Sequence, residues 1–125
     1  MKYRFLFWFE WGSGTVFQTD NDAANHKFGV GIIRPEHFPL TPETIEQIHS
    51  MSKWHDKSLN WDYPPDPGPW RQDECDRFNA ASKQLIEVVV KELGEDFEII
   101  YHQGPLHEDP DLDEYLKDPH GFKRK

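Results

Sequence analysis

The nine residues 3–11, Tyr-Arg-Phe-Leu-Phe-Trp-Phe-Glu-Trp, decide the fold of this chain. An aromatic ring stands at every second position, and this alternation predicts a β-strand, in which successive side chains point to opposite faces. Leu6 and Trp8 make the second face apolar as well, which favours a strand in the interior of a sheet. The loop Gly12-Ser13-Gly14 follows, and we expect residues 15–19 to return as a second strand of a hairpin.

Two later segments have the periodicity of helices. Residues 72–93 carry an apolar stripe that begins at Phe78, with acidic residues in the first turns and Gly94 at the expected end. Residues 41–59 begin with Thr-Pro-Glu, a typical helix start. We also expect a short helix at 23–28, a short strand at 30–33 and a last strand at 97–102.

The order of these elements predicts an α+β fold. We expect a two-layer sandwich, in which a small, mainly antiparallel sheet carries the two long helices on one face. The first and last strands are expected to pair near its centre. Residues 1–104 would form a single globular domain. Residues 105–125 would form an acidic C-terminal segment that lies on the surface or is partly disordered, because it has few large apolar side chains.

The chain is short, acidic and aromatic. Its 125 residues include 23 acidic and 14 basic residues, a net charge of -9, and 9 Phe, 5 Trp and 4 Tyr. We expect one domain with a core of few but large side chains. The charge is uneven, since residues 61–118 contain 16 acids and 5 bases. This surface argues against a nucleic-acid partner and favours a basic one, although a merely solvated acidic face is the alternative.

The sequence also bears on location. Cys75 is the single cysteine, which excludes an internal disulfide. The apolar run within residues 1–15 is too short for a signal peptide, and no stretch reaches the length of a transmembrane helix. We therefore expect a cytoplasmic protein with no membrane partner.

The loop from Asn60 to Trp70 is the most specific feature. Four of its eleven residues are proline, so it should be extended and stiff. Trp and Tyr dominate binding energy at protein interfaces, and a stiff loop loses little entropy on binding. We predict a partner-binding surface formed by Trp61, Asp62, Tyr63, Asp66, Trp70, Asp73, Glu74 and Asp76. The alternative is that the aromatic rings pack back over the helices.

A second class of function depends on a different set of residues. Histidine and carboxylate side chains bind transition metals, so a small metal-dependent enzyme or metal-binding protein could use His102, His107, Asp109 and Asp111. The spacing matches no established metal motif, and no catalytic motif stands out. Acidic neighbours should raise the pKa of Cys75, which we interpret as an unreactive thiol. We favour a protein that is not an enzyme and has no cofactor.

Several short sequences carry a family resemblance: Phe-Glu-Trp-Gly-Ser-Gly at 9–14, Ser-Leu-Asn-Trp-Asp-Tyr-Pro-Pro at 58–65, and Pro-Trp at 69–70. Over about residues 3–103 the chain resembles small bacterial immunity proteins, including those of contact-dependent growth inhibition systems. The resemblance implies an inhibitor that binds and neutralises a cognate toxin. The acidic charge would suit a basic, nuclease-type toxin domain, whose active site the immunity protein would block.

Overall fold

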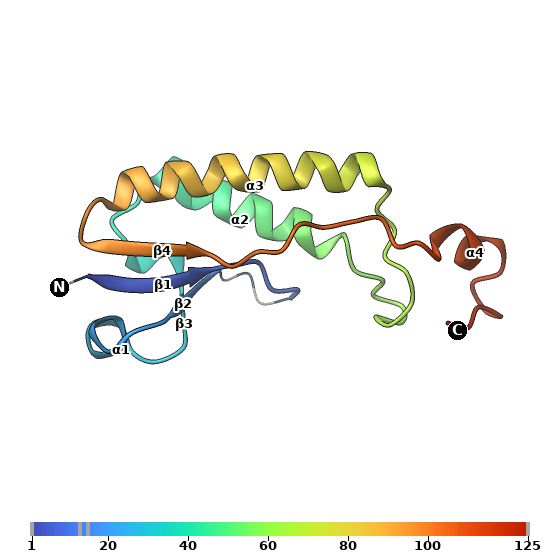
Figure 1. The fold of residues 1–125 in the computed structure, drawn as a ribbon, viewed down its shortest axis with the longest axis horizontal. Coiled ribbons are helices and arrows are strands. Elements are labelled where there is room, and N and C mark those ends of the chain that lie inside the picture. The colour runs from blue at the N-terminus through green and yellow to red at the C-terminus, as the bar shows by residue number, and fades with distance from the viewer. Residues whose placement is uncertain (1, 13, 15, 125) are drawn as a thin grey trace.

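The centre of the fold is a four-stranded mixed sheet (Figure 1). The computed structural model describes residues 2–12, 14 and 16–124. Within them the strands are β1 (Tyr3–Phe7), β2 (Phe17–Thr19), β3 (Ile32–Ile33) and β4 (Phe97–Tyr101), in the order β3-β2-β1-β4. β2 is antiparallel to both β1 and β3, whereas β4 joins β1 in parallel. The predicted pairing of the first and last strands is confirmed, but β4 is an edge strand, so the prediction that they pair near the centre of the sheet is only met by β1.

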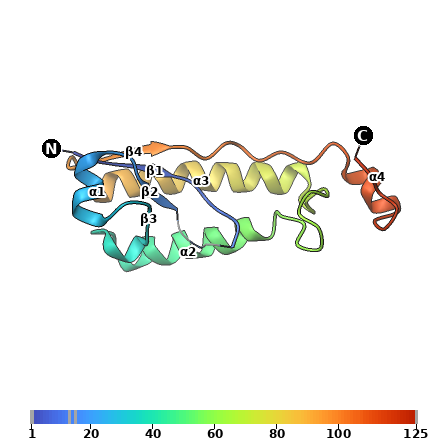
Figure 2. The same ribbon diagram turned by 90° about the horizontal axis from the view of Figure 1, so that it is seen from below.

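Two long helices form the second layer. α2 (Pro42–Asp56) and α3 (Gln72–Leu93) lie side by side on one face of the sheet (Figures 1 and 2). The shorter elements are α1 (Asp22–Phe28), the 3-10 turn η1 (Pro35–His37) and α4 (Leu112–Lys117). The α+β two-layer sandwich is thus confirmed, with a mixed sheet. Among the described residues, no helix combines the length and apolar character that crossing a membrane requires.

The ends of α2 and α3 follow from local chemistry. The Thr41 hydroxyl accepts a hydrogen bond from the backbone N–H of Thr44, and Pro42 occupies the first turn, as predicted. The Glu92 carboxylate accepts from the Thr41 backbone N–H at 2.8 Å and from the Thr44 hydroxyl at 2.5 Å. These hydrogen bonds lower the pKa of Glu92. They also join the end of α3 to the start of α2.

Phenylalanine is the most frequent residue of the core. Phe5 and Phe7 of β1 are completely buried beneath the helices. The Phe38 ring lies 4.9 Å from that of Phe5 and 4.3 Å from that of Phe17, measured between ring centroids. Edge and tilted ring contacts of this kind stabilise the core beyond the contribution from burial of the apolar surface. The expectation of a core made of few but large side chains is confirmed.

β1 is shorter than the alternation predicted. The strand ends at Phe7, although the chain continues alongside its neighbours: Trp8 donates its backbone N–H to Val16, and Phe9 donates to the side chain of Gln103. Phe9 is buried like Phe5 and Phe7 before it. The alternating pattern therefore predicts which side chains are buried, and it extends beyond the hydrogen-bonded strand. Ser13 of the predicted hairpin loop and Thr15, the predicted first residue of the return strand, lie outside the described residues.

His55 closes the core at the end of α2. Its side chain is 2 % exposed and stacks on Trp11 at 4.9 Å, with the Phe78 ring 5.5 Å away. Within the described part of the chain, its buried Nδ1 atom has no hydrogen-bond partner. Burial lowers the pKa of His55 to about 4, while the neighbouring Asp56 charge acts in the opposite direction. The imidazole is therefore neutral in the folded protein near neutral pH.

This buried histidine predicts a loss of stability in mild acid. The unfolded chain protonates His55 near its ordinary pKa of 6.5, whereas the folded chain resists protonation down to about 4. Stability is therefore complete above the unfolded pKa and falls with pH across this window. We expect the free energy of unfolding to drop by roughly 2 kcal/mol between about pH 7.5 and about pH 5, measured by urea denaturation. His55→Phe keeps a stacked ring and should flatten the slope; an unchanged slope in this variant would contradict the assignment.

Candidate functional site

The Asn60–Trp70 loop is organised around the buried side chain of Asn60. Its amide donates to the Pro67 carbonyl at 3.2 Å, and its Oδ1 atom accepts from the backbone N–H groups of Asp62 and Tyr63, each at 3.1 Å. Asn60 is only 8 % exposed, so these bonds are shielded from water. One side chain thus fixes both arms of the loop.

Gly68 closes the neck of this loop. A Cβ atom at this position would overlap the backbone carbonyl oxygen of Ser58. Only glycine allows the two backbone segments to come this close. Together with the Asn60 hydrogen bonds, this contact closes the loop at its neck, so the prediction of an extended loop is wrong. The stiffness expected from the prolines stays a prediction.

The loop aromatics divide into two groups. Trp61 and Tyr63 are 56 % and 58 % exposed, although the Trp61 indole N–H donates to the Asp56 carbonyl at 2.6 Å. Trp70 turns inward, and its ring lies 5.6 Å from both Trp54 and Phe78. Trp70 thus packs back over the helices, whereas Trp61 and Tyr63 are exposed to solvent.

Trp11 is an exposed aromatic residue outside the site predicted from the sequence. It is 44 % exposed, and its indole N–H lies 3.1 Å from the His55 carbonyl and 2.9 Å from the Ser58 hydroxyl oxygen. The adjacent Gly12 lies against the Trp61 ring. Two tryptophans distant in sequence therefore meet at the end of α2. The available signal was the position of Trp11 directly before the glycine loop, beyond the end of β1.

The predicted acidic residues also divide. Glu74 is partly buried: it accepts from the Trp54 indole at 2.6 Å and pairs with Arg77 at 2.6 Å. Asp73 pairs with the same arginine at 3.3 Å, and these carboxylates raise the pKa of Arg77. Asp76 accepts a hydrogen bond from the Gln72 side chain.

Asp62 and Asp66 differ from these acids. Among the residues that the structure describes, neither takes part in an ion pair, and Asp62 lies on the exposed part of the loop. An unpaired exposed carboxylate keeps its full charge for an approaching partner. These two acids, placed between Trp61 and Trp70, therefore carry the charge of the loop.

The C-terminal segment runs from β4 across the start of α3 to the loop. Asn79 holds it first, with 2.9 Å hydrogen bonds to the backbone N–H and carbonyl of Leu106. Gln72 and Glu108 then exchange two hydrogen bonds of 3.0 Å, each from a backbone N–H to the other side chain. Further along, Leu112 at the start of α4 is 1 % exposed. The segment is thus attached at successive points.

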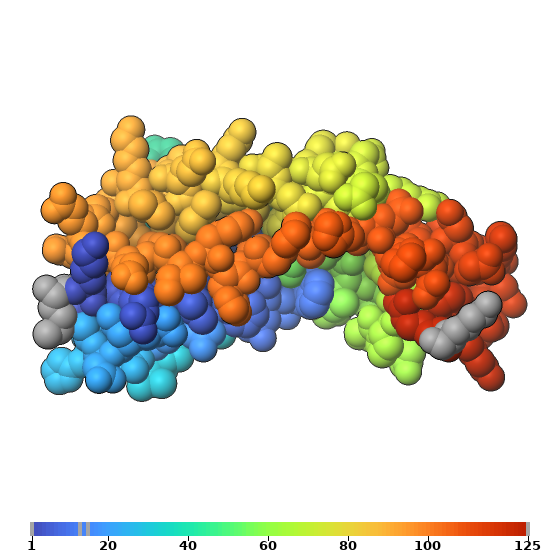
Figure 3. All heavy atoms as spheres, viewed as in Figure 1, coloured from blue at the N-terminus to red at the C-terminus, as the bar shows by residue number. Residues whose placement is uncertain are grey.

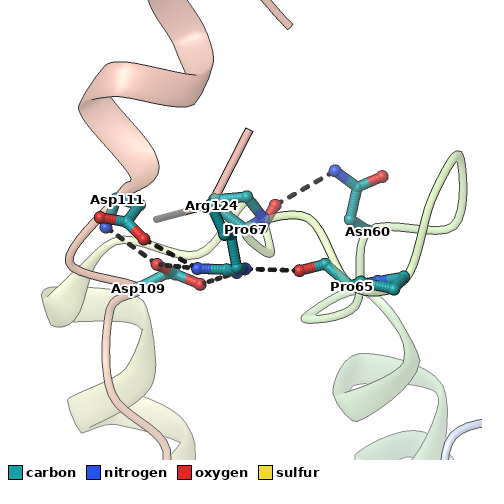
Figure 4. Close-up of polar contacts among 6 residues, drawn as sticks. All are labelled: Asn60, Pro65, Pro67, Asp109, Asp111 and Arg124. Carbon is teal, nitrogen blue, oxygen red and sulfur yellow. Dashed lines mark hydrogen bonds and ion pairs between the residues drawn. The ribbon is translucent and has the colours of Figure 1, made fainter. Parts of the chain in front are cut away.

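Arg124 joins the C-terminal segment to the loop. Its guanidinium lies 2.6 Å from Asp109, 2.9 Å from Asp111 and 2.7 Å from the Pro65 carbonyl oxygen (Figure 4). Arg124 lowers the pKa of Asp109, and the two carboxylates raise the pKa of Arg124. The exposed atoms of the loop and of this segment consequently lie together at one end of the molecule (Figure 3).

The metal hypothesis gains no support from this arrangement. Asp109 and Asp111 hold Arg124, while the backbone of His102 bonds to Phe7 at the end of β4. Across the described residues, no group of three or more His, Cys, Asp or Glu could hold a metal ion. Burial, together with nearby acids such as Asp76, raises the pKa of Cys75, which agrees with its interpretation as an unreactive thiol.

The hydrogen bonds of the Asn60 side chain lead to a prediction about the loop. Asn60→Ala would leave the Pro67 carbonyl and the N–H groups of Asp62 and Tyr63 without partners. We expect the free energy of unfolding to fall by about 1–3 kcal/mol, and amide hydrogen exchange of Asp62 and Tyr63 to accelerate. Gln47→Ala, which truncates an exposed amide side chain of α2, is the control. Unchanged exchange at both loop amides would show that Asn60 does not fix the loop.

Comparison with known proteins places this chain in a family. No curated protein matches it. Residues 10–104 match the model of the Serratia CdiI immunity protein-like family. The matched region includes Trp11, the Asn60–Trp70 loop, both long helices and β4, and it covers well over half of the chain. The chain therefore belongs to the Serratia CdiI immunity protein-like family.

Proposed function

We propose that this protein is a non-enzymatic inhibitor that acts in the cytoplasm. It would bind a cognate toxin with a basic, nuclease-type catalytic domain and neutralise it by covering the active site. Membership of an immunity-protein family supports the toxin partner. The chemistry of the Asn60–Trp70 loop supports the location of the contact and the charge of the partner.

One observation carries the proposal: a loop with a fixed backbone presents two large aromatic side chains to solvent. Trp61 and Tyr63 are each more than half exposed, while the loop backbone beneath them is fixed by Asn60 and Gly68. Exposed aromatic side chains of this kind keep apolar surface in contact with water, and binding a partner that covers them is therefore favourable. Because the loop is already ordered, binding costs little conformational entropy.

The charges explain why the partner should be basic. Residues 61–118 contain 16 acids and 5 bases, and Asp62 and Asp66 lie at the loop itself. Active sites that bind RNA or DNA contain cationic side chains for the phosphates. An acidic surface attracts such a site over long range and speeds association. Asp73 and Asp76 would flank the contact, whereas Trp70 and Glu74 would support it from below.

The binding experiment uses the purified protein encoded immediately upstream of this chain. We expect the wild-type chain to form a tight complex, and Trp61→Ala and Tyr63→Ala to weaken it by at least about 30-fold each, because both side chains would be central to the interface. Isothermal titration calorimetry measures the change. Val90→Ala truncates an exposed apolar residue of α3 and should change affinity by less than about threefold. Full affinity in both loop variants would exclude this loop as the docking surface.

The charge contribution has its own prediction. Asp62→Asn with Asp66→Asn should slow association and weaken its dependence on salt between about 50 and about 500 mM, because the attraction is screened. Stopped-flow fluorescence measures the rate, and Glu46→Gln on α2 is the control for loss of an exposed acid. The complex should also abolish cleavage of RNA or DNA by the upstream protein. If the complex is tight but its association rate does not depend on salt, the toxin is still the partner, but the proposal of a basic contact surface is wrong.

A further inference from the structure

A groove separates the Asn60–Trp70 loop from α4. It has a volume of about 270 Å³, with Trp61 and Pro67 on the loop side and Leu112, Tyr115 and Leu116 on the side of the C-terminal segment. Asp62 lines it as well, and none of the described lining residues is basic. Leu116 is 53 % exposed, so its side chain is available to whatever enters. The groove thus combines apolar walls with one carboxylate.

The two walls of the groove differ in origin. The loop lies inside the family match at residues 10–104, whereas Leu112, Tyr115 and Leu116 lie beyond it. The second wall is nevertheless fixed to the first, because Arg124 spans Asp109, Asp111 and the Pro65 carbonyl (Figure 4). Burial of Leu112 anchors the start of α4 in the same way. The groove is therefore formed before any partner arrives.

We propose that this groove is a specificity pocket for one arginine or lysine side chain of the toxin. The inference rests on the proposed function and identifies a single contact within it. The aliphatic stem of the side chain would lie between Trp61 and Leu116, which suits the apolar part of a long basic residue. The cationic head would meet Asp62 and the face of Trp61. A groove with apolar walls and one unpaired acid matches this residue type better than a purely apolar or an acidic one.

The pocket would also explain how one immunity protein tells toxins apart. Specificity is a difference in affinity between partners, so a pocket that leaves its carboxylate unpaired with the wrong toxin disfavours that toxin. Because the C-terminal segment supplies a wall outside the matched family region, its sequence can set the depth of the pocket separately from the core. Leu116 would be the residue that sets partner choice most directly.

The test compares two lysine substitutions of equal charge. Leu116→Lys places a cation in the pocket, whereas Val90→Lys places one on α3, at a residue of similar exposure, 46 % against 53 %. Both variants change the net charge equally, so long-range attraction to the upstream-encoded protein is matched. We expect Leu116→Lys to weaken binding by at least about 30-fold and Val90→Lys by less than about threefold. Circular dichroism and urea denaturation confirm that both variants fold.

A third variant identifies the occupant. Leu116→Glu should bind at least about tenfold more tightly than Leu116→Lys if the side chain in the pocket is cationic. Equal losses in the two variants would indicate an apolar occupant and overturn the cationic assignment. Wild-type affinity for Leu116→Lys would overturn the pocket while leaving the proposed function intact. If the wild-type chain does not bind the upstream protein at all, both proposals fail. A wild-type dimer that Leu116→Lys dissociates would assign the groove to a second copy of this chain instead.

Discussion

The burial of Phe5 and Phe7 against α2 and α3 is the constraint on which the rest of the structure depends. These rings belong to the core that the two helices cover on one face of the sheet, and the Asn60–Trp70 loop connects those two helices. The same line of buried residues continues past the sheet to Phe9, which packs near His55 at the end of α2. The end of α2 then holds Trp11 and Trp61 through backbone carbonyls. The hydrophobic core and the exposed aromatic surface are thus connected through the end of α2.

Charge in this protein is organised more finely than the net value of -9 suggests. Arginines neutralise acids locally: Arg77 holds Asp73 and Glu74, and Arg124 holds Asp109 and Asp111. These pairs are partly exposed, so each contributes little to stability. Their larger effect is to hold side chains in place for hydrogen bonds to other elements. Arg124 donates to the Pro65 carbonyl of the loop, and Glu74 accepts from the Trp54 indole of α2. The acids that remain unpaired at the loop are consequently few and well placed.

The sequence predicted best those features that depend on neighbouring residues. The bounds of α3 were predicted correctly, because its apolar stripe and Gly94 are local signals. The prolines of the loop predicted a stiff and extended segment, but they did not indicate that the loop closes at Gly68. The sequence did not reveal that β4 joins β1 in parallel, since that pairing depends on how the intervening helices return the chain. Nor did it predict α4, whose position depends on distant contacts of Leu112 and Arg124. Trp61 and Trp70 share one loop, and only tertiary packing separates their roles.

The contact between Gly68 and Ser58 makes the loop a closed ring of backbone. Exposed residues at the tip of the loop, such as Tyr63, can be exchanged without removing this contact or the Asn60 hydrogen bonds. Under the proposed function, the scaffold and the recognition sequence are therefore separable. A chain of this kind could follow a changing toxin through a few substitutions at the tip of the loop, while the folded framework stays the same.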